Sequence, residues 1–166
     1  MGYIIEDITL KPFSDEDLDI FRVWIDKEYI YKWLCPDGEE EKVAWIDEII
    51  FRDTEFHYLK HFIVYCKDVK IGFCLHAEAF YLKEHYGDLP DIEHTYEIGY
   101  FIGVEEYLNK GIGKMIVKKI EEKIIEIGGK QILADPSEEN VVSIKTLLSN
   151  GFTKHKDCDY RKVLYK

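Results

Sequence analysis

The chain has 166 residues, a net charge of −11 and 46% hydrophobic residues, which predicts one folded domain over residues 1–166. Nucleic-acid binding requires a basic surface, so this acidic charge argues against a nucleic-acid partner. A negative cleft that attracts a cationic small molecule and a charge surplus that only serves solubility are both compatible with the composition.

The N-terminal half alternates between strand-like and helix-like patterns. In chain order we expect a strand over residues 3–13, a helix over 14–34, a turn at 35–38, a helix over 39–53 and two antiparallel strands over 61–80. Ser14 and Asp17 resemble a capping box at the start of the first helix. The second helix is expected to bury one side, made of Val43, Ile46, Ile49 and Ile50.

The C-terminal half continues the mixed pattern. We expect a polar, tyrosine-rich loop over residues 81–94, a strand over 95–104, a glycine turn, a helix over 113–127, a strand over 130–136, a helix over 137–152 and a strand over 158–166. The middle helix carries an apolar stripe at Ile112, Ile116, Ile120, Ile124 and Ile127. This order predicts an α/β fold of the α+β type with a mixed sheet.

The cysteines and the hydropathy of the chain bear on its location. Cys35, Cys66, Cys74 and Cys158 form no C-x-x-C pair, which indicates reduced thiols in a cytoplasmic protein. The chain contains no run of 18 apolar residues and no signal-peptide pattern, so we expect no membrane partner.

Metal binding is not expected either. His57 and His61 have the i, i+4 spacing of a zinc-protease helix, but Tyr58 stands where such a helix needs a glutamate. We therefore expect no metal cofactor.

Residues 107–120, YLNKGIGKMIVKKI, place Gly111 and Gly113 just before a predicted helix. The run matches neither a P-loop nor a dinucleotide fingerprint in full. It does predict free backbone N–H groups at the positive end of a helix dipole, with Lys110 and Lys114 adding positive charge. This indicates a phosphate or pyrophosphate site, or else a plain strand–helix turn that uses glycine for its geometry.

Residues 99–117, GYFIGVEEYLNKGIGKMIV, and residues 132–152, ILADPSEENVVSIKTLLSNGF, together resemble the GNAT superfamily of N-acetyltransferases. The first segment is similar to its acetyl-CoA loop, Q/R-x-x-G-x-G/A, although Leu108 replaces the leading Gln or Arg. Within the superfamily, the FIG…KGIG, DP…N and GF runs most resemble bacterial aminoglycoside 6'-N-acetyltransferases. The resemblance implies a single-domain, mostly antiparallel mixed sheet with a splayed central strand pair and flanking helices.

The resemblance also implies acetyl-CoA as cosubstrate and no metal. The pantetheine arm would pair with the splayed strand at Phe101, Ile102 and Gly103. The pyrophosphate would lie on the loop, formed by Asn109, Lys110, Gly111, Ile112, Gly113 and Lys114. Asn140, which opens a later helix, matches a position that contacts the cofactor arm.

Acetyl transfer to an amine requires a base. The aminoglycoside enzymes carry an Asp in the splayed strand, G-[IM]-D-Q, where this chain has Gly99, while Glu97 lies on the same strand face two residues earlier. Glu97 is expected as the base or as an amine ligand, or it is a solvent-facing carboxylate. Asp135 matches the substrate-binding Asp of the DP run, or it is a helix N-cap before Pro136.

The resemblance also bears on which residue protonates the leaving thiolate and which residues contact the acceptor. The family acid is a Tyr in the last helix, where this chain has Leu147; Tyr107, Tyr160 or a water replaces it, or no acid is needed. Trp33 stands where the relatives carry aromatics that flank the sugar rings, or it packs in the core. Acidic loop residues that could gather cations, or simply be solvated, are Glu84, Asp88, Asp91 and Glu93.

The sequence therefore predicts an acetyl-CoA-dependent N-acetyltransferase that moves an acetyl group directly to a primary amine of a cationic small molecule, with an aminoglycoside as the leading candidate. Two alternatives remain. The acceptor is a protein N-terminus, a lysine or another metabolite, or the domain binds acyl-CoA without catalysis. We expect a monomer or a homodimer.

Overall fold

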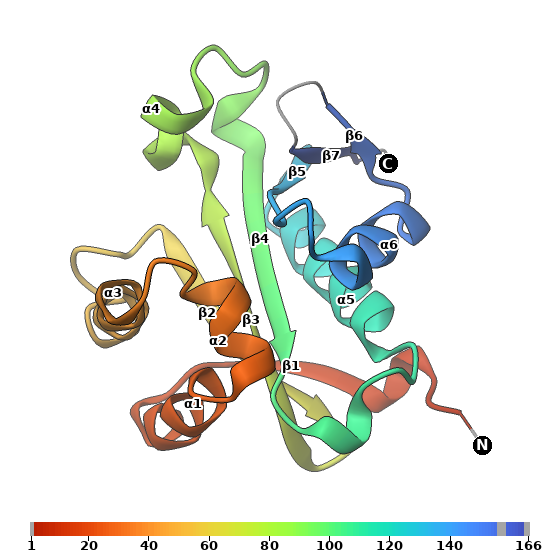
Figure 1. The fold of residues 1–166 in the computed structure, drawn as a ribbon. Helices are drawn as coiled ribbons and strands as arrows, with labels where there is room; N and C mark the ends of the chain where they lie inside the picture. The colour runs from red at the N-terminus through yellow and green to blue at the C-terminus, as the bar shows by residue number, and fades with distance from the viewer. Residues whose placement is uncertain (1, 156–158, 165–166) are drawn as a thin grey trace.

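The computed structural model describes residues 2–155 and 159–164, which form a seven-stranded sheet with helices on both faces (Figure 1). The strand order is β1–β2–β3–β4–β5–β7–β6. The strands are β1 (Ile8–Pro12), β2 (Leu59–Cys66), β3 (Val69–Glu78), β4 (Thr95–Ile102), β5 (Gln131–Ala134), β6 (Thr153–Lys154) and β7 (Tyr160–Val163). Neighbouring strands are antiparallel except β4 and β5, which run parallel. The predicted mixed, mostly antiparallel sheet is confirmed.

The helices divide between the two faces of the sheet. They are α1 (Leu18–Ile25), α2 (Glu28–Leu34), α3 (Glu39–Ile50), α4 (Lys83–Tyr86), α5 (Ile112–Glu126) and α6 (Val141–Ser149). Helices α1, α2 and α3 lie on one face, and α5 and α6 lie on the other (Figure 1). No helix in the described ranges is long and apolar enough to cross a membrane.

Two hydrophobic clusters, one on each face, hold these layers together. Under α5, four residues of the predicted isoleucine stripe are buried, whereas Ile127 is exposed because the helix ends at Glu126. The opposite cluster contains Phe21, Phe73 and Phe101, whose rings contact one another. Strand β3 contributes to both clusters, since its side chains alternate between the two faces.

The predicted helix over residues 14–34 is wrong as a single element. The chain forms α1 and α2 instead, because Lys27 is extended and its Nζ donates to the carbonyl of Gly103 at 2.7 Å. The Tyr29 hydroxyl donates to the carbonyl of Ile102, also at 2.7 Å. These two contacts fix the start of α2 against the end of β4.

Other predicted boundaries and faces also need correction. Strand β1 is shorter than predicted because a 3-10 turn over Ile5–Asp7 precedes it, and the loop over residues 81–94 contains α4. In α3, Ile46 and Ile49 are buried as expected, but Val43 and Ile50 are exposed. The buried face of α3 includes Trp45, so Val43 and Ile50 lie beyond its edge.

The central strand pair is splayed, as predicted. Parallel pairing between β4 and β5 covers only Thr95 to Glu97 on β4, which continues to Ile102. Strand β5 ends at Ala134, and Pro136 follows two residues later without a backbone N–H to continue a ladder. The edge of β4 that faces β5 is therefore unpaired beyond Glu97.

Cys35, Cys66 and Cys74 are buried free thiols, and Cys158 lies outside the described residues.

Candidate active site

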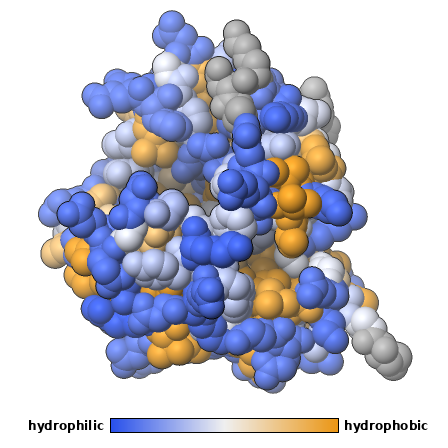
Figure 2. Space-filling model, in the orientation of Figure 1, coloured by the Kyte–Doolittle hydropathy of each residue, from blue (hydrophilic) through white to orange (hydrophobic). Residues whose placement is uncertain are grey.

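A cavity of about 300 Å³ opens where β4 and β5 separate. Its lining comes from β4, from the loop after β5, and from α2, α3 and α6. Five of the site residues predicted from the sequence line it: Trp33, Glu97, Phe101, Asp135 and Asn140. The side of the molecule drawn in Figure 2 is largely hydrophilic, with exposed hydrophobic residues in small groups.

Glu97 is a half-buried side chain of β4 on the wall of this cavity. The hydroxyl of Tyr86, from α4, donates a hydrogen bond to Oε2 of Glu97. Burial, and then repulsion from Asp135, raise the pKa of Glu97 to about 7, while His85 opposes the shift. A carboxylate with this pKa exchanges protons readily at neutral pH.

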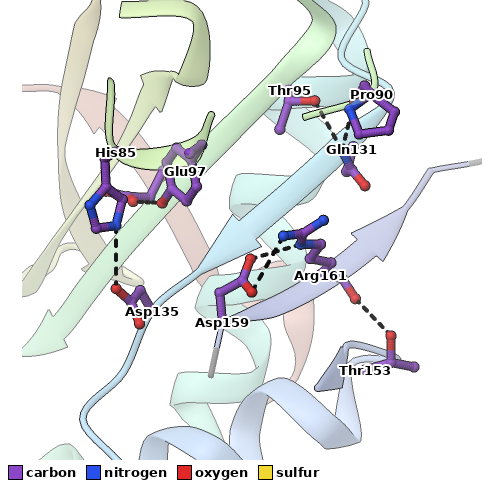
Figure 3. A network of polar contacts seen from close by, with 10 residues as sticks. His85, Pro90, Thr95, Glu97, Gln131, Asp135, Thr153, Asp159 and Arg161 are labelled. Carbon is purple, nitrogen blue, oxygen red and sulfur yellow. Dashed lines mark hydrogen bonds and ion pairs between the residues drawn. The ribbon is translucent and has the colours of Figure 1, made fainter. Parts of the chain in front are cut away.

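Asp135 follows β5 and lies across from α4. Its Oδ2 is 3.8 Å from Nε2 of His85, and Figure 3 shows the two side chains facing each other. Partial burial raises the pKa of Asp135. The N-cap alternative for Asp135 is wrong, because α6 begins at Val141 and Asn140 caps it: Asn140 Oδ1 accepts from the N–H of Ser143 at 3.2 Å.

The glycine turn leads into α5 at a different place from this cavity. Asn109 and Gly111 both have left-handed backbones, with φ of 59° and 78°, and α5 starts at Ile112 with no side chain capping it. A Cβ added at Gly111 would meet nothing within 4 Å, whereas one at Gly113 would lie in ordinary contact with Thr146 at 3.8 Å and Tyr100 at 4.0 Å. The N–H groups of the first helical turn therefore have no partner within the helix and no side-chain cap.

A model of the family described as acetyltransferase (GNAT) domain matches residues 7–153 of the chain. The chain belongs to the GNAT acetyltransferase family. It is an N-acetyltransferase that uses acetyl-CoA.

Solved structures share the fold of this GNAT chain. Aminoglycoside acetyltransferase AAC(6')-Ib, in complex with ribostamycin and coenzyme A, matches with a TM-score of 0.82 and 18% identity over 95% of this chain and 93% of its own. An aminoglycoside N(6')acetyltransferase from Legionella pneumophila matches at 0.72 and 15%, over 98% and 94%. RimL, a ribosomal L7/L12 alpha-N-protein acetyltransferase, matches at 0.71 and 15%, over 95% and 91%.

The glycine turn of this GNAT domain fits the pyrophosphate of acetyl-CoA. The uncapped start of α5 offers backbone donors at the positive end of the helix dipole. Lys110 and Lys114 are exposed on either side of Gly111, whose surroundings are open.

Only some of the three β4 residues predicted to pair with the pantetheine arm of acetyl-CoA have backbone groups that face the gap. Gly103 has both backbone groups bonded within the protein, because its N–H donates to Ile71 at 2.7 Å and its carbonyl accepts from Lys27. A Cβ at Gly103 would lie 2.3 Å from the Trp24 ring, so packing already requires glycine there. Since backbone groups alternate along a strand, Phe101 faces β3 like Gly103, whereas Ile102 and Tyr100 face the gap.

Several contributors to the site were missed in the sequence. Tyr86 and His85 contact the two predicted carboxylates, and the Tyr100 hydroxyl lies 3.3 Å from Ser143 Oγ on the cavity wall. The strand period does not mark Tyr100, because it places this side chain on the face opposite to Glu97 and Gly99. No local pattern marks the tyrosine or histidine of α4.

Some of the predicted residues do not reach the cavity. Leu147 is fully buried and lines it, but Tyr107 and Tyr160 do not. The loop acids are exposed and do not line it either: Glu84, Asp88, Asp91 and Glu93. In the described residues, no group of three or more His, Cys, Asp or Glu is arranged to hold a metal ion.

Proposed function

We propose that the protein transfers the acetyl group of acetyl-CoA directly to a primary amine of a cationic small molecule, with the amine held at Glu97. The observation that carries this proposal is the charge of the cavity at the splay. Its lining includes the carboxyl groups of Glu41, Glu97 and Asp135, and no Lys, Arg or His among the described residues. Such a wall attracts an ammonium group and repels an anionic acceptor.

The cofactor would lie along residues already described. Its arm would run past β4 at Phe101, Ile102 and Gly103, with Ile102 the member of this set that faces the gap. The pyrophosphate would lie at residues 109–114, and Asn140 would flank the arm from the start of α6. Open space at Gly111 supports this placement.

Acetyl-CoA supplies the thioester, whose carbonyl carbon bonds to the amine nitrogen as its bond to sulfur breaks and CoA leaves as the thiol. Glu97 takes a proton from the bound ammonium, which exposes the nitrogen lone pair. Because its pKa is about 7, a large fraction of Glu97 is ionised at neutral pH. Asp135 holds the ammonium from the other side of the cavity. Of the two protons that nitrogen loses, one ends on the thiol and one passes through Glu97 to solvent.

Tyr100 is the hydroxyl that we infer delivers the thiol proton. Leu147 occupies the family position of that acid, and neither Tyr107 nor Tyr160 lines the cavity. Burial raises the pKa of Tyr100, which keeps its hydroxyl protonated. A thiolate of ordinary acidity is a fair leaving group, so this contribution is smaller than that of Glu97.

An aminoglycoside is the specific acceptor that the subgroup resemblance suggests. The net charge of −11 and the position of Trp33 on the cavity wall support it. A protein N-terminus is a second candidate, supported by the shared fold with RimL. Buried free cysteines support a cytoplasmic location, and we infer a monomer or a homodimer.

Release of CoA thiol from acetyl-CoA, measured with aminoglycosides, aliphatic amines and a peptide with a free N-terminus, tests the proposal. Glu97→Gln should lower kcat/KM about a hundredfold or more, because general bases contribute factors of this size. Its Kd for acetyl-CoA should change little. Glu93→Gln, at an exposed loop acid, is the matched control and should behave as wild type. Undiminished turnover by Glu97→Gln would remove Glu97 from the mechanism.

A further inference from the structure

A second cavity, of about 290 Å³, lies beneath α3 and adjoins the first. The two cavities share Glu41, Trp45, Leu75 and Glu97 as lining residues. An acceptor whose amine reaches Glu97 therefore has room to extend from the transfer site toward α3.

Glu48 is the distinctive group of this second cavity. It is half-buried, and no described residue gives it a hydrogen bond or an ion pair. Burial, and then repulsion from Glu97, raise its pKa to about 7. A carboxylate in this setting is destabilised until a cation arrives.

The three fully buried acids among the described residues each have a cation partner. Asp17 pairs with Lys70 at 2.6 Å, Glu121 pairs with Lys162 at 2.8 Å, and Asp159 pairs with Arg161 at 2.7 Å. The fold thus supplies a cation to these acids and leaves Glu48 without one. No Lys, Arg or His lines the second cavity within the described ranges.

The rest of the wall is mostly apolar and aromatic, with the carboxyl of Glu41 and the hydroxyl of Tyr58 as further polar groups. Leu59, Leu75, Ala77 and Leu82 contribute aliphatic groups, and Trp45 contributes an aromatic face. Methylene groups pack favourably on such a wall, and an ammonium is stabilised near aromatic faces. The aliphatic part of this wall offers no hydrogen-bond partner to a sugar hydroxyl, which disfavours burying a sugar ring against it.

We propose that this second cavity binds the distal ammonium of an aliphatic diamine or polyamine, held by Glu48, while the proximal amine is acetylated at Glu97. The inference rests on the proposed function and narrows its acceptor class. Two ammonium groups joined by methylenes match two carboxylates joined by an apolar wall. The acidic net charge of −11 favours approach of such a polycation.

The test compares amines of equal carbon number that differ only in the distal amine. The ratio of kcat/KM for putrescine to that for n-butylamine is measured for wild type, Glu48→Gln and Glu40→Gln. Wild type should prefer the diamine about tenfold or more, since an unshared charge pair in a half-buried site has this weight. Glu48→Gln should reduce the ratio about tenfold. Glu40→Gln removes an exposed carboxylate from the same helix and should leave the ratio unchanged.

Thermal unfolding would reveal whether Glu48→Gln is misfolded, and a second variant tests the cavity independently of Glu48. Ala44 is an exposed α3 position that also lines the second cavity, so Ala44→Phe should fill the cavity and lower the same ratio. Calorimetric titration of wild type and Ala44→Phe with putrescine in the presence of CoA gives a readout without turnover. Equal putrescine affinity in both proteins would overturn the inference.

Failure of the second-cavity assignment and failure of the proposed function would give different results. Equal wild-type rates with putrescine and n-butylamine, or faster turnover of an aminoglycoside than of any aliphatic diamine, would overturn the second-cavity assignment and leave the proposed function intact. Binding of acetyl-CoA with transfer to no amine would overturn both.

Discussion

Replacing Tyr86 with Phe should shift the pH dependence of acetyl transfer and leave the rate at high pH nearly unchanged. The Tyr86 hydroxyl donates to Oε2 of Glu97, and a donor to a carboxylate stabilises its ionised form. Phe keeps the ring and removes only the donor. This change does not alter the charged groups that act on Glu97 or line the cavities with it, namely Asp135, His85, Glu48 and Glu41. The pKa of Glu97, about 7 in the wild type, should therefore rise.

The size of the rise follows from the strength of one such hydrogen bond. A hydrogen bond to a charged group contributes about 1.5–3 kcal/mol, and water entering the half-buried site recovers part of it. A net loss of about 1.4 kcal/mol corresponds to one pKa unit, so the pKa of Glu97 in the variant should be about 8. At pH 7 the ionised fraction then falls from about one half to about one tenth, and kcat/KM falls about fivefold. By about pH 9 both proteins are mostly ionised at this position, so their rates converge.

The assay is kcat/KM for one amine across the pH range, compared as the ratio of variant to wild type so that protonation of the acceptor cancels. Tyr81→Phe is the matched control, because Tyr81 precedes α4, is 49% exposed and stacks on Tyr58. The control should leave the acidic limb in place. A Tyr86→Phe ratio that is the same at every pH would refute the assignment of Glu97 as the base.

Two further predictions concern the cofactor turn and acid stability. Gly113→Val should weaken acetyl-CoA binding about tenfold or more by calorimetry while the protein stays folded, because a Cβ at Gly113 would make only ordinary contacts, with Thr146 at 3.8 Å and Tyr100 at 4.0 Å. Gly111→Val is a poorer test, since the φ of Gly111 is +78°. Burial, and then nearby cations, lower the pKa values of His61 and His76 from 6.5 to about 4, so their stabilising contribution is complete above pH 6.5 and is lost as the pH falls toward 4. The raised pKa values of Glu48 and Glu97 act in the opposite direction, because protonation of these carboxyls stabilises the fold as the pH falls from 7. Removing one histidine should therefore shift the change in urea midpoint between pH 7 and pH 5 toward greater stability in a His61→Phe variant than in wild type; an equal change in both would exclude His61 as a cause.

The sequence predicted correctly those elements in which the apolar period of the residues matches the side that is buried in the fold. The isoleucines of α5 recur on one side of a helix, and that side meets the sheet. The break between α1 and α2 was not predictable in this way. It depends on Lys27 and Tyr29 reaching Gly103 and Ile102, which are 76 and 73 residues away in the sequence. Contacts between such distant segments leave no mark on the hydrophobic period of either one.

The same distinction applies to the site. Asp135 and Trp33 were predicted by matching residues to a family pattern, and Glu97 by strand alternation from the position where the family has an Asp; the fold brings all three to one cavity. Tyr86 and Glu48 acquire their meaning only from the arrangement of α4 and α3 around that cavity. Their environments, a donor to one carboxylate and a missing cation for the other, are properties of three-dimensional packing.

The departure at Gly99, where the aminoglycoside enzymes carry an Asp, offers a last test. A Cβ at Gly99 would lie 3.6 Å from Cγ of Leu75, an ordinary contact, so packing does not force glycine there. The carboxylate at Glu97 instead borders both cavities, whereas Gly99 lines only the first. Gly99→Asp should therefore fold, and its new charge should raise the pKa of Glu97 by repulsion.

The pH profile of Gly99→Asp distinguishes the two possible positions of the base. If Glu97 remains the base, the acidic limb of kcat/KM moves to higher pH. If the new Asp takes over the proton, the limb moves to lower pH, and the double variant Gly99→Asp, Glu97→Gln stays active. That double variant could be active and yet have lost the preference for putrescine over n-butylamine. Such a result would show that the position of the base on β4, and not only its presence, couples acetyl transfer to the second cavity.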